Sequence, residues 1–443
     1  MSQAQTALKR ELGLTSATAM VVGEVIAVGI FLTPAEMAKS LGSPLLVLIV
    51  WIAMGVMALS GAFCYGELAA RFPQAGGGYV YLREAYGPRL AFLYGWKCFL
   101  VMDPGITAAL GVGLASYASS IIPLSPLGLK LVAGGAVLVI AAANIVGVRI
   151  GARVLQWLAL VKIGSLLFII LWGFVGGLGN WSNLVPFAAQ RPGSSPLFGA
   201  LAGGLLAGFF SFGGWWDVSK MTGEIRDPGR TLPRAIALGV LAVTLVYIMT
   251  SAVFMYLVPM DLVTSGETFA AQAGEVLFGP AGEKIFAAIV VVSVLGSLTA
   301  VLMTAPRVYY AMARDRLFFS GAASIHPRLG TPARAIAIQA TLACLLIGLG
   351  TFQEIIAYFV FITVIFIGLT VAAVFVLRRR KETSSYLAPG FPVTPVIFLV
   401  LVAILLVLLA GSHPKQALLG TAVVALGLPV YEFVVRRRKE TLT

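Results

Sequence analysis

The stretch GEVIAVGIFLTP, residues 23–34, combines two features that are unusual inside a membrane helix. Gly23 and Gly29 bracket the segment, and Glu24 places a carboxylate in an otherwise apolar run. Glycine weakens a helix, and a charged side chain at the centre of a membrane span costs about 2.5–3.5 kcal/mol on insertion scales. The two features together indicate a helix that is interrupted within the membrane.

The rest of the chain has the composition of a membrane protein. Of its 443 residues, 59% are hydrophobic and 11% are charged, whereas soluble domains have about 25% charged residues. Apolar windows of 18 or more residues recur, and each can cross the hydrocarbon layer. They are too long and too apolar for barrel strands. We therefore expect one all-α polytopic membrane domain over residues 1–443, with no cleavable signal peptide after the polar start MSQAQTALKRE.

The apolar windows predict twelve membrane helices. Their approximate ranges are 16–42, 44–70, 90–118, 128–147, 152–177, 198–219, 234–258, 283–313, 333–350, 353–378, 391–411 and 416–436. Of the 31 Lys and Arg residues, 25 fall on the side of the two termini, 5 on the other side, and Lys162 inside a span. Because positive charge gathers on the cytoplasmic side, we expect a multi-pass protein of the cell membrane with both termini in the cytoplasm. The net charge of +13 is explained by this orientation and by anionic lipid headgroups, and we expect no nucleic acid partner.

The chain offers no catalytic or metal-binding constellation. Its three cysteines, Cys64, Cys98 and Cys344, lie in predicted spans, and its two histidines, His326 and His413, lie in predicted loops. Cys/His metal spacing, a Ser-His-Asp set and a phosphate-binding glycine loop are absent from the sequence. We expect free thiols, no metal, no cofactor and no enzymatic activity.

A second glycine-rich interruption suggests an internal repeat. The first predicted span is interrupted at 23–29 and the sixth at 211–216, SFGGWW. Because they are five spans apart, the two broken helices run in opposite directions, which is the pattern of an inverted repeat with a binding site between the breaks. The repeats would cover about 16–177 and 198–378, with two additional helices at about 391–436.

Broken helices expose peptide groups that suit an amino acid zwitterion. Helix N-terminal amides favour a carboxylate, and C-terminal carbonyls favour an ammonium. The amide of Gly29 is a candidate donor to a carboxylate, while Gly213 and Gly214 permit a ligand to approach the backbone. The alternative is that these glycines only allow close helix packing. Aromatic residues around the second break either close over a ligand or fill the core: Phe210, Phe212, Trp215 and Trp216.

Four charged residues near the breaks require partners. Lys162 lies too deep in its span to reach the interface easily, so we expect a fixed ammonium beside the first break that stands in for sodium or loses its proton during coupling. Glu24 has several candidate roles: pairing with Lys162, carrying a coupling proton, contacting a ligand amine, or reaching a water-filled vestibule. Asp103 precedes a proline and is expected to be structural. Asp217 is expected to form a solvated pair with Lys220.

Four segments of the chain together resemble the amino acid permeases of the amino acid–polyamine–organocation superfamily, most closely their L-type amino acid transporter branch. They are GEVIAVGIFLTP (23–34), YGELAARFPQAGGGYVYLREAYG (65–87), FFSFGGWWDVSKMTGEIRDPGRTLPRAI (209–236) and GSLTAVLMTAPRVYYAMARD (296–315). The resemblance implies a five-plus-five inverted repeat of the LeuT type with broken helices 1 and 6, two extra C-terminal helices, and alternating access.

The resemblance also implies roles for individual residues. Substrate would be bound by Val25, Ala27, Val28, Gly29, Phe210, Ser211, Gly213 and Gly214. Phe210 would also serve as the gate. Lys162 would replace a sodium ion, with Gly23 and Ser297 as its neighbours and Glu24 as a further coupling residue.

This chain departs from the family pattern at four places. Val28 narrows the first break, Glu24 stands where a small or hydroxyl residue is usual, Asp103 is unexpected, and Trp216–Asp217 replaces a more polar, uncharged pair. The loop SIIPLSPLGLK has no cysteine, so no disulfide-linked accessory subunit is expected, and we expect a monomer.

The sequence thus predicts sodium-independent transport of small or medium neutral L-amino acids, by exchange or by symport with a proton. A carrier of cationic amino acids or polyamines is the alternative suggested by Glu24 and Asp103. An amino acid sensor that does not transport is a third reading, which the lack of a signalling domain disfavours.

Overall fold

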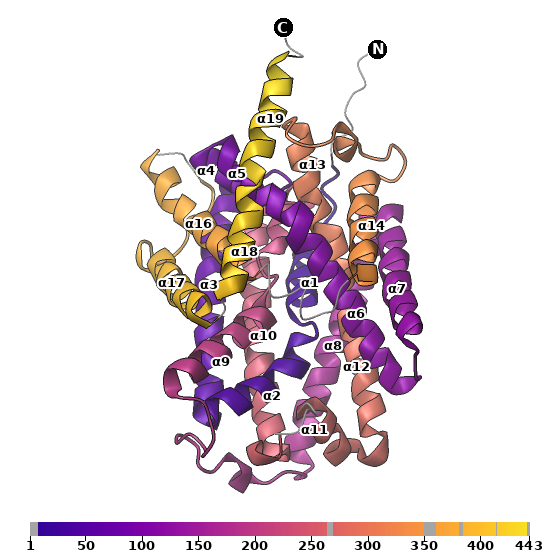
Figure 1. The fold of residues 1–443 in the computed structure, drawn as a ribbon, viewed down its shortest axis with the longest axis vertical. Helices are drawn as coiled ribbons and strands as arrows, with labels where there is room; N and C mark the ends of the chain where they lie inside the picture. Colours follow the sequence, from indigo (N-terminus) through magenta and orange to yellow (C-terminus); the bar gives the residue numbers. More distant parts are fainter. Residues whose placement is uncertain (1–7, 264–268, 350–359, 381–383, 413, 441–443) are drawn as a thin grey trace.

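The computed structural model describes residues 8–263, 269–349, 360–380, 384–412 and 414–440 and is all-helical apart from one isolated β-bridge within this part of the chain. Both termini lie at the same end of an elongated helix bundle (Figure 1). The first half contains α1 (Leu14–Val25), α2 (Gly29–Leu41), α3 (Pro44–Arg71), α4 (Gly78–Tyr86), α5 (Pro88–Lys97), the π-helical turn η1 (Cys98–Met102), α6 (Asp103–Ile121), α7 (Pro126–Val146), α8 (Val148–Val175) and the short turn η2 (Trp181–Leu184).

The second half begins with α9 (Leu197–Phe212), the 3-10 segment η3 (Asp217–Glu224), α10 (Pro228–Leu257), η4 (Met260–Leu262), α11 (Phe269–Phe278), η5 (Gly279–Ala281), α12 (Gly282–Thr304) and α13 (Pro306–Arg314). It continues with η6 (Ser320–Ala323), α14 (Ala333–Leu349), α16 (Val360–Arg379), α17 (Val393–Ser412), α18 (Pro414–Ala425) and α19 (Gly427–Glu440).

The described helices confirm a polytopic α-helical membrane protein. Ten of them are long and apolar enough to cross a membrane, and α1 with α2 forms an eleventh candidate that is bent by 44° at its break. A shorter apolar helix, Ala333–Gly348, corresponds to the ninth predicted span. The tenth predicted span, 353–378, begins outside the described residues. Twelve spans and an inverted repeat remain predictions.

Both breaks are narrower than the sequence predicts. Gly23 and Glu24 stay in α1, and the non-helical turn covers only 26–28. In the second break α9 continues through Phe212, so that the turn covers 213–216. Unpaired peptide groups are costly in hydrocarbon, so each helix keeps its hydrogen bonds up to the turn; the Ile26 amide, for example, still bonds the Val22 carbonyl at 2.9 Å.

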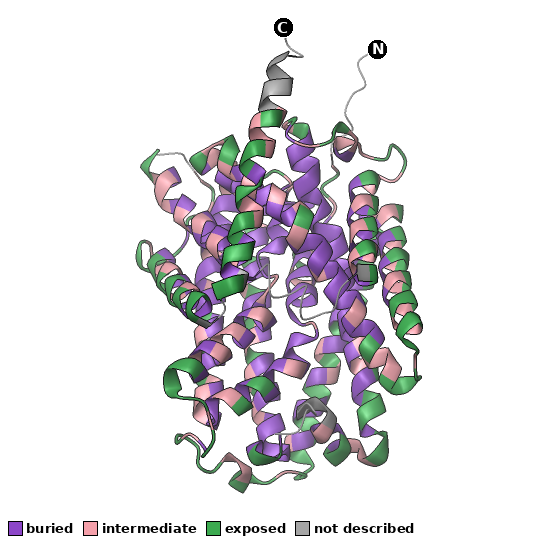
Figure 2. Cartoon of the chain, in the orientation of Figure 1, coloured by how far each residue is buried: buried purple, intermediate pink, exposed green. Residues whose placement is uncertain are grey.

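Buried residues concentrate in the interior of the bundle, while the outer helices carry more exposed residues (Figure 2). Many of the exposed residues are large and apolar. Helix α10 packs along α3 and α1, and α12 packs along α6 and α8. Small residues allow these close approaches: a Cβ added at Gly239 would lie 2.5 Å from a Val21 methyl group, and one added at Gly55 would lie 2.5 Å from Thr244. This packing encloses the two breaks.

Buried ion pairs join the elements at the end of the bundle that carries the termini. The Arg307 guanidinium contacts both carboxylate oxygens of Glu224, at 2.8 and 3.1 Å, and both side chains are 1% exposed. The Glu224 carbonyl also accepts hydrogen bonds from the amides of Glu11 and Leu12. This contact ties the start of the chain to η3 and α13.

We predict that Arg307→Met lowers the melting temperature of the detergent-purified protein. Removal of one partner of a buried ion pair leaves an uncompensated charge and costs about 3–5 kcal/mol. The control is Arg149→Met, because Arg149 is 63% exposed in its ion pair with Glu11 and exposed pairs contribute about 0–1 kcal/mol. Equal melting temperatures for the two variants would contradict the prediction.

Candidate functional site

The two helix breaks face each other in the middle of the bundle. The Tyr247 hydroxyl of α10 lies 2.8 Å from the Val25 carbonyl oxygen and 3.0 Å from the Ser211 carbonyl oxygen, so one buried donor serves both breaks. The hydroxyls of Thr33 and Ser211 are 2.7 Å apart. A Cβ added at Gly29 would lie 2.9 Å from the Ser211 Cα. Only glycine at position 29 therefore permits this approach.

A cavity of about 800 Å³, counting the part that is open to solvent, lies between the breaks. All eight residues predicted to bind substrate line it: Val25, Ala27, Val28, Gly29, Phe210, Ser211, Gly213 and Gly214. Among the charged residues singled out from the sequence, Glu24 and Asp217 also line it. The structure thus brings together residues that are separated by almost two hundred positions in the chain.

The N-terminus of one helix and the C-termini of two others lie at this cavity. Helix α2 begins at Gly29, and its first amides have no partner within the helix. Helix α1 ends at Val25 and α9 ends at Phe212, so that carbonyl oxygens of two C-termini lie nearby. A helix start favours negative charge and a helix end favours positive charge. The cavity therefore offers complementary poles for a carboxylate and an ammonium group.

The wall opposite the breaks is mainly apolar. It is formed by α6 and α16, with Ile106, Leu110 and Val360 among the lining residues. This wall suits an uncharged side chain of small or medium size. This apolar wall could not be predicted from the sequence, because apolar residues that line a cavity look the same in a span as residues that face lipid or fill the core.

The aromatic residues near the second break divide between two environments. Phe210 and Trp216 line the cavity. Phe212 instead packs on Trp51 and Tyr247, and Trp215 packs on Tyr65 and Phe398. Phe212 and Trp215 therefore fill the core, whereas closure of Phe210 or Trp216 over a ligand stays a prediction.

Lys162 lies beside the first break and bonds to its backbone. Its Nζ donates to the carbonyl oxygens of Gly23, at 3.1 Å, and Ile26, at 2.5 Å, and lies 3.4 Å from Ser297 Oγ. The Ser297 hydroxyl also bonds to the Gly23 carbonyl at 2.7 Å. Ser293, one helical turn earlier, bonds to the Ile26 carbonyl at 3.1 Å.

Sequence reasoning missed Ile26 and Ser293 in this group. The spacing of four between Ser293 and Ser297 would place both on one helix face, and this was the available signal. Lys162 bonds to carbonyls and a hydroxyl, and no ion pair between Lys162 and Glu24 occurs among the described residues.

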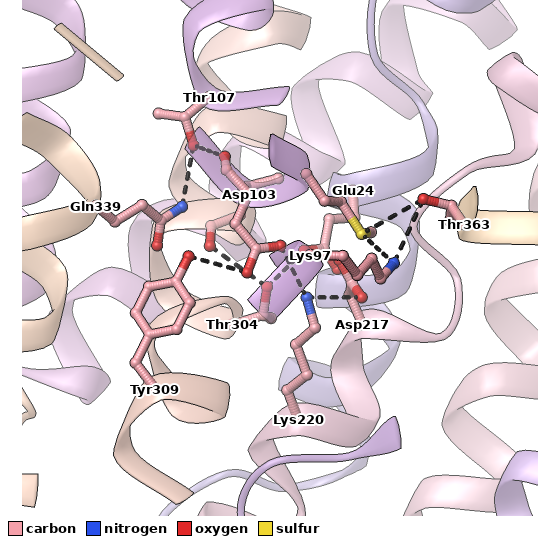
Figure 3. Close-up of polar contacts among 12 residues, drawn as sticks. Glu24, Lys97, Asp103, Thr107, Asp217, Lys220, Thr304, Tyr309, Gln339 and Thr363 are labelled. Atoms are coloured by element: carbon pink, nitrogen blue, oxygen red, sulfur yellow. Dashed lines mark hydrogen bonds and ion pairs between the residues drawn. The ribbon is translucent and has the colours of Figure 1, made fainter. Parts of the chain in front are cut away.

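A buried charge network lies next to the cavity (Figure 3). Lys220 Nζ lies 3.3 Å from an oxygen of Asp103 and 3.0 Å from an oxygen of Asp217. The Tyr309 hydroxyl donates to Asp103 at 3.0 Å, and the Thr304 hydroxyl donates to Glu24 at 2.7 Å.

The expectation that Asp217 and Lys220 form a solvated pair is wrong. Asp217 is 3% exposed and Lys220 is 1% exposed. The non-helical turn at 213–216 directs η3 back into the bundle, and α6 supplies Asp103 as a second partner. Asp103 is more than one hundred residues away from Asp217 and Lys220 in the sequence, so the local sequence does not reveal this partner.

Lys97 is a further buried cation that the sequence placed at the cytoplasmic side. It is 3% exposed, lies 2.9 Å from Met102 Sδ and 3.4 Å from Thr363 Oγ1, and approaches the Tyr94 ring at 5.0 Å. The π-helical turn η1 directly follows it. Across the described residues, no group of three or more His, Cys, Asp or Glu side chains is arranged to hold a metal ion.

Comparison with known proteins agrees with this geometry. A family model described as amino acid permease matches residues 12–428. The chain belongs to the amino acid permease family. It is 32% identical to "Large neutral amino acids transporter small subunit 2" of Mus musculus over 432 residues, which cover 96% of this chain and 81% of that protein.

Two further relatives cover almost the whole permease chain. "Serine/threonine exchanger SteT" of Bacillus subtilis is 31% identical over 442 residues, or 98% of both chains. "Asc-type amino acid transporter 1" of Mus musculus is 31% identical over 435 residues, which cover 96% of this chain and 81% of that protein. The resemblance found in the sequence segments is confirmed, and the permease is an amino acid transporter by family.

We predict that Gly29→Ala abolishes amino acid binding by the permease. The added methyl group would clash with Ser211, whose Cα and Oγ would lie 2.9 and 2.7 Å away, and would push the two breaks apart. The measurement is the rise in melting temperature caused by a panel of neutral L-amino acids, because ligands that bind only the folded state stabilise it.

The control variant is Gly199→Ala on the same α9 helix that contributes Ser211. No atom lies within 4 Å of a Cβ added there, so ligand stabilisation should match the wild type. A Gly29→Ala protein that is stabilised as strongly as the wild type would show that the close approach of the breaks is unnecessary for binding.

Proposed function

We propose that this permease is a sodium-independent secondary transporter that moves L-amino acids across the cell membrane by alternating access. Small and medium neutral amino acids are the proposed cargo, moved by exchange or in symport with a proton. The observation that carries the proposal is the meeting of two interrupted helices around one cavity, with the start of α2 and the ends of α1 and α9 as its poles. Discontinuous helices of this kind bind substrate in transporters.

The environment of Lys162 supports sodium independence. Unwound carbonyls and helix C-termini hold the coupling cation in many transporters. Here the carbonyl oxygens of Gly23 and Ile26 and the Ser297 hydroxyl surround a lysine ammonium. A covalently attached positive charge supplies what a bound sodium ion would otherwise provide.

Neutral cargo and exchange are supported by the cavity wall and by the relatives. The apolar residues of α6 and α16 match an uncharged side chain. One relative is named as a transporter of large neutral amino acids and another as a serine/threonine exchanger. The carboxylates of Glu24 and Asp217 on the same cavity are the specific observation in favour of the alternative cargo, cationic amino acids or polyamines. Substrate binding without flux would instead support a non-transporting sensor.

The remaining proposals concern the context of the protein. We assign both termini to the cytoplasm, because 25 of the 31 Lys and Arg residues fall on their side of the predicted spans and positive charge gathers on the cytoplasmic side. We propose a monomer that needs neither a cofactor nor a disulfide-linked accessory subunit, since the loop between α6 and α7 has no cysteine. The protein acts on its substrate by transport and has no proposed enzymatic reaction.

We predict that Lys162→Ala reduces amino acid uptake into proteoliposomes at least tenfold. Loss of the ammonium would leave the carbonyls of Gly23 and Ile26 without their cation. The control is Lys130→Ala, because Lys130 is exposed and bonds to the Gly348 carbonyl far from the breaks. Replacement of external sodium by choline should leave wild-type uptake unchanged. Full activity of Lys162→Ala would remove the proposed role.

We predict that neutral L-amino acids inside the vesicles accelerate uptake of labelled L-serine or L-leucine. Exchange requires a substrate on each side, whereas uptake that ignores internal substrate would argue against exchange. Arginine and putrescine serve as competitors in the same assay. Competition by these two but not by alanine or leucine would favour the cationic alternative.

A further inference from the structure

We propose that Glu24 holds a proton while the cavity is empty and releases it when the α-ammonium group of an amino acid binds. The amino acid and the proton would then occupy the site alternately and move in opposite directions. This inference rests on the proposed function, since it requires an amino acid in the cavity. It adds the identity of the proton site, and it replaces proton symport by exchange of the amino acid against a proton.

The Glu24 carboxyl group is buried and only half satisfied. The residue is 6% exposed, and its Oε1 accepts a hydrogen bond from the Thr304 hydroxyl at 2.7 Å. Its Oε2 is buried and has no hydrogen-bond partner among the described residues, and Glu24 is one of the residues that line the cavity. A buried polar oxygen without a partner is costly, so this oxygen is suited to a group that enters the cavity or to a bound proton.

Two helix ends make this position unfavourable for a lone negative charge. Glu24 lies in the last turn of α1, one residue before the helix ends at Val25. The turn that follows the end of α9 passes directly beside it, since a Cβ added at Gly214 would lie 3.1 Å from the Glu24 Cβ. Helix C-termini carry partial negative charge. The Lys162 ammonium already bonds to carbonyls at the end of α1, so the end of α9 and the neighbouring carboxylates are what favour either a neutral carboxyl group or an additional cation at Glu24.

The neighbouring cations are engaged elsewhere. Lys220 is shared between Asp103 and Asp217. Lys162 bonds to backbone carbonyls and Ser297, and Lys97 contacts Met102 and Thr363. The charged groups that act on Glu24 are Asp217 and Lys220 of η3 and Asp103 of α6. Lys162 of α8, Tyr247 of α10, Lys97 of α5 and Tyr309 of α13 are further buried titratable groups near the first break or this network.

Glu24 is thus a third carboxyl group beside a single lysine that already pairs with two. In the empty cavity a proton on Glu24 reduces the excess negative charge. When an amino acid binds, its ammonium group occupies the same pair of helix ends and provides the missing positive charge. The Glu24 O–H bond then breaks, the electron pair stays on the carboxylate, and the proton leaves to the water on the open side of the cavity.

This competition sets the direction of coupling. Binding of the ammonium and binding of the proton oppose each other, and by linkage each lowers the affinity for the other. After the carrier has released its amino acid inside the vesicle, the empty cavity returns to the outer side with a proton bound to Glu24. Net amino acid uptake is therefore accompanied by proton movement out of the vesicle. Symport would instead require the proton and the ammonium group to occupy the site at the same time.

The first test is isothermal titration of the full-length protein in detergent with L-leucine and L-serine at pH 7. The binding enthalpy is measured in buffers of different ionisation enthalpy, so that its slope gives the number of protons exchanged. We expect the wild type to release about one proton per amino acid and Glu24→Gln to release none. Glu36→Gln, an exposed residue of α2, is the matched control and should release as many protons as the wild type.

The second test uses proteoliposomes of the wild type and does not depend on folding of a variant. An interior more acidic than the exterior should accelerate uptake of labelled L-leucine or L-serine severalfold, and the reversed gradient should slow it. Proton uptake on binding, or stimulation by an acidic exterior, would overturn the inference, as would binding without proton exchange. Failure of the wild type to bind or transport any amino acid would instead overturn the proposed function.

Discussion

Peptide groups in the middle of a membrane must find partners within the protein, and this requirement controls the structure of the permease. Interruption of α1–α2 and of α9–η3 leaves carbonyl and amide groups without helical partners. The Tyr247 hydroxyl reaches carbonyls of both breaks, while Lys162 and Ser297 satisfy the carbonyls of the first. Each of these side chains comes from a continuous helix, so the uninterrupted helices hold the broken ones in place.

The same requirement creates the binding capacity. The start of α2 and the ends of α1 and α9 lie at one cavity, where water or a zwitterion can meet their peptide groups. The buried network of Asp103, Asp217 and Lys220 lies close to Glu24, which lines the same cavity. Stability of the backbone and recognition of the ligand therefore depend on one arrangement.

The unusual residues that the local sequence singles out lie at or beside the helix breaks in the structure. The glycine interruptions, the depth of Lys162 and the position of Glu24 were all visible because a membrane span tolerates few such residues. The breaks were predicted too wide, since composition shows where a helix is weak but the hydrogen-bond network shows where it stops. The sequence shows that Asp217 is close to Lys220 along the chain, but it does not show that η3 returns into the bundle. Their ion pair is therefore buried, and not solvated as predicted.

The sequence by itself determined that the chain is a helical membrane protein of the amino acid permease family, because hydrophobic length, charge distribution and specific segments carry that information locally. Only the tertiary structure decided which charged groups share a partner and which oxygen of Glu24 lacks a hydrogen-bond partner. These contacts join α1, α6, η3 and α12. The residue pattern within one helix contains no information on how the other helices are rotated. The physical reason is that electrostatic pairing depends on distance in space, whereas the hydrophobic pattern depends on distance along the chain.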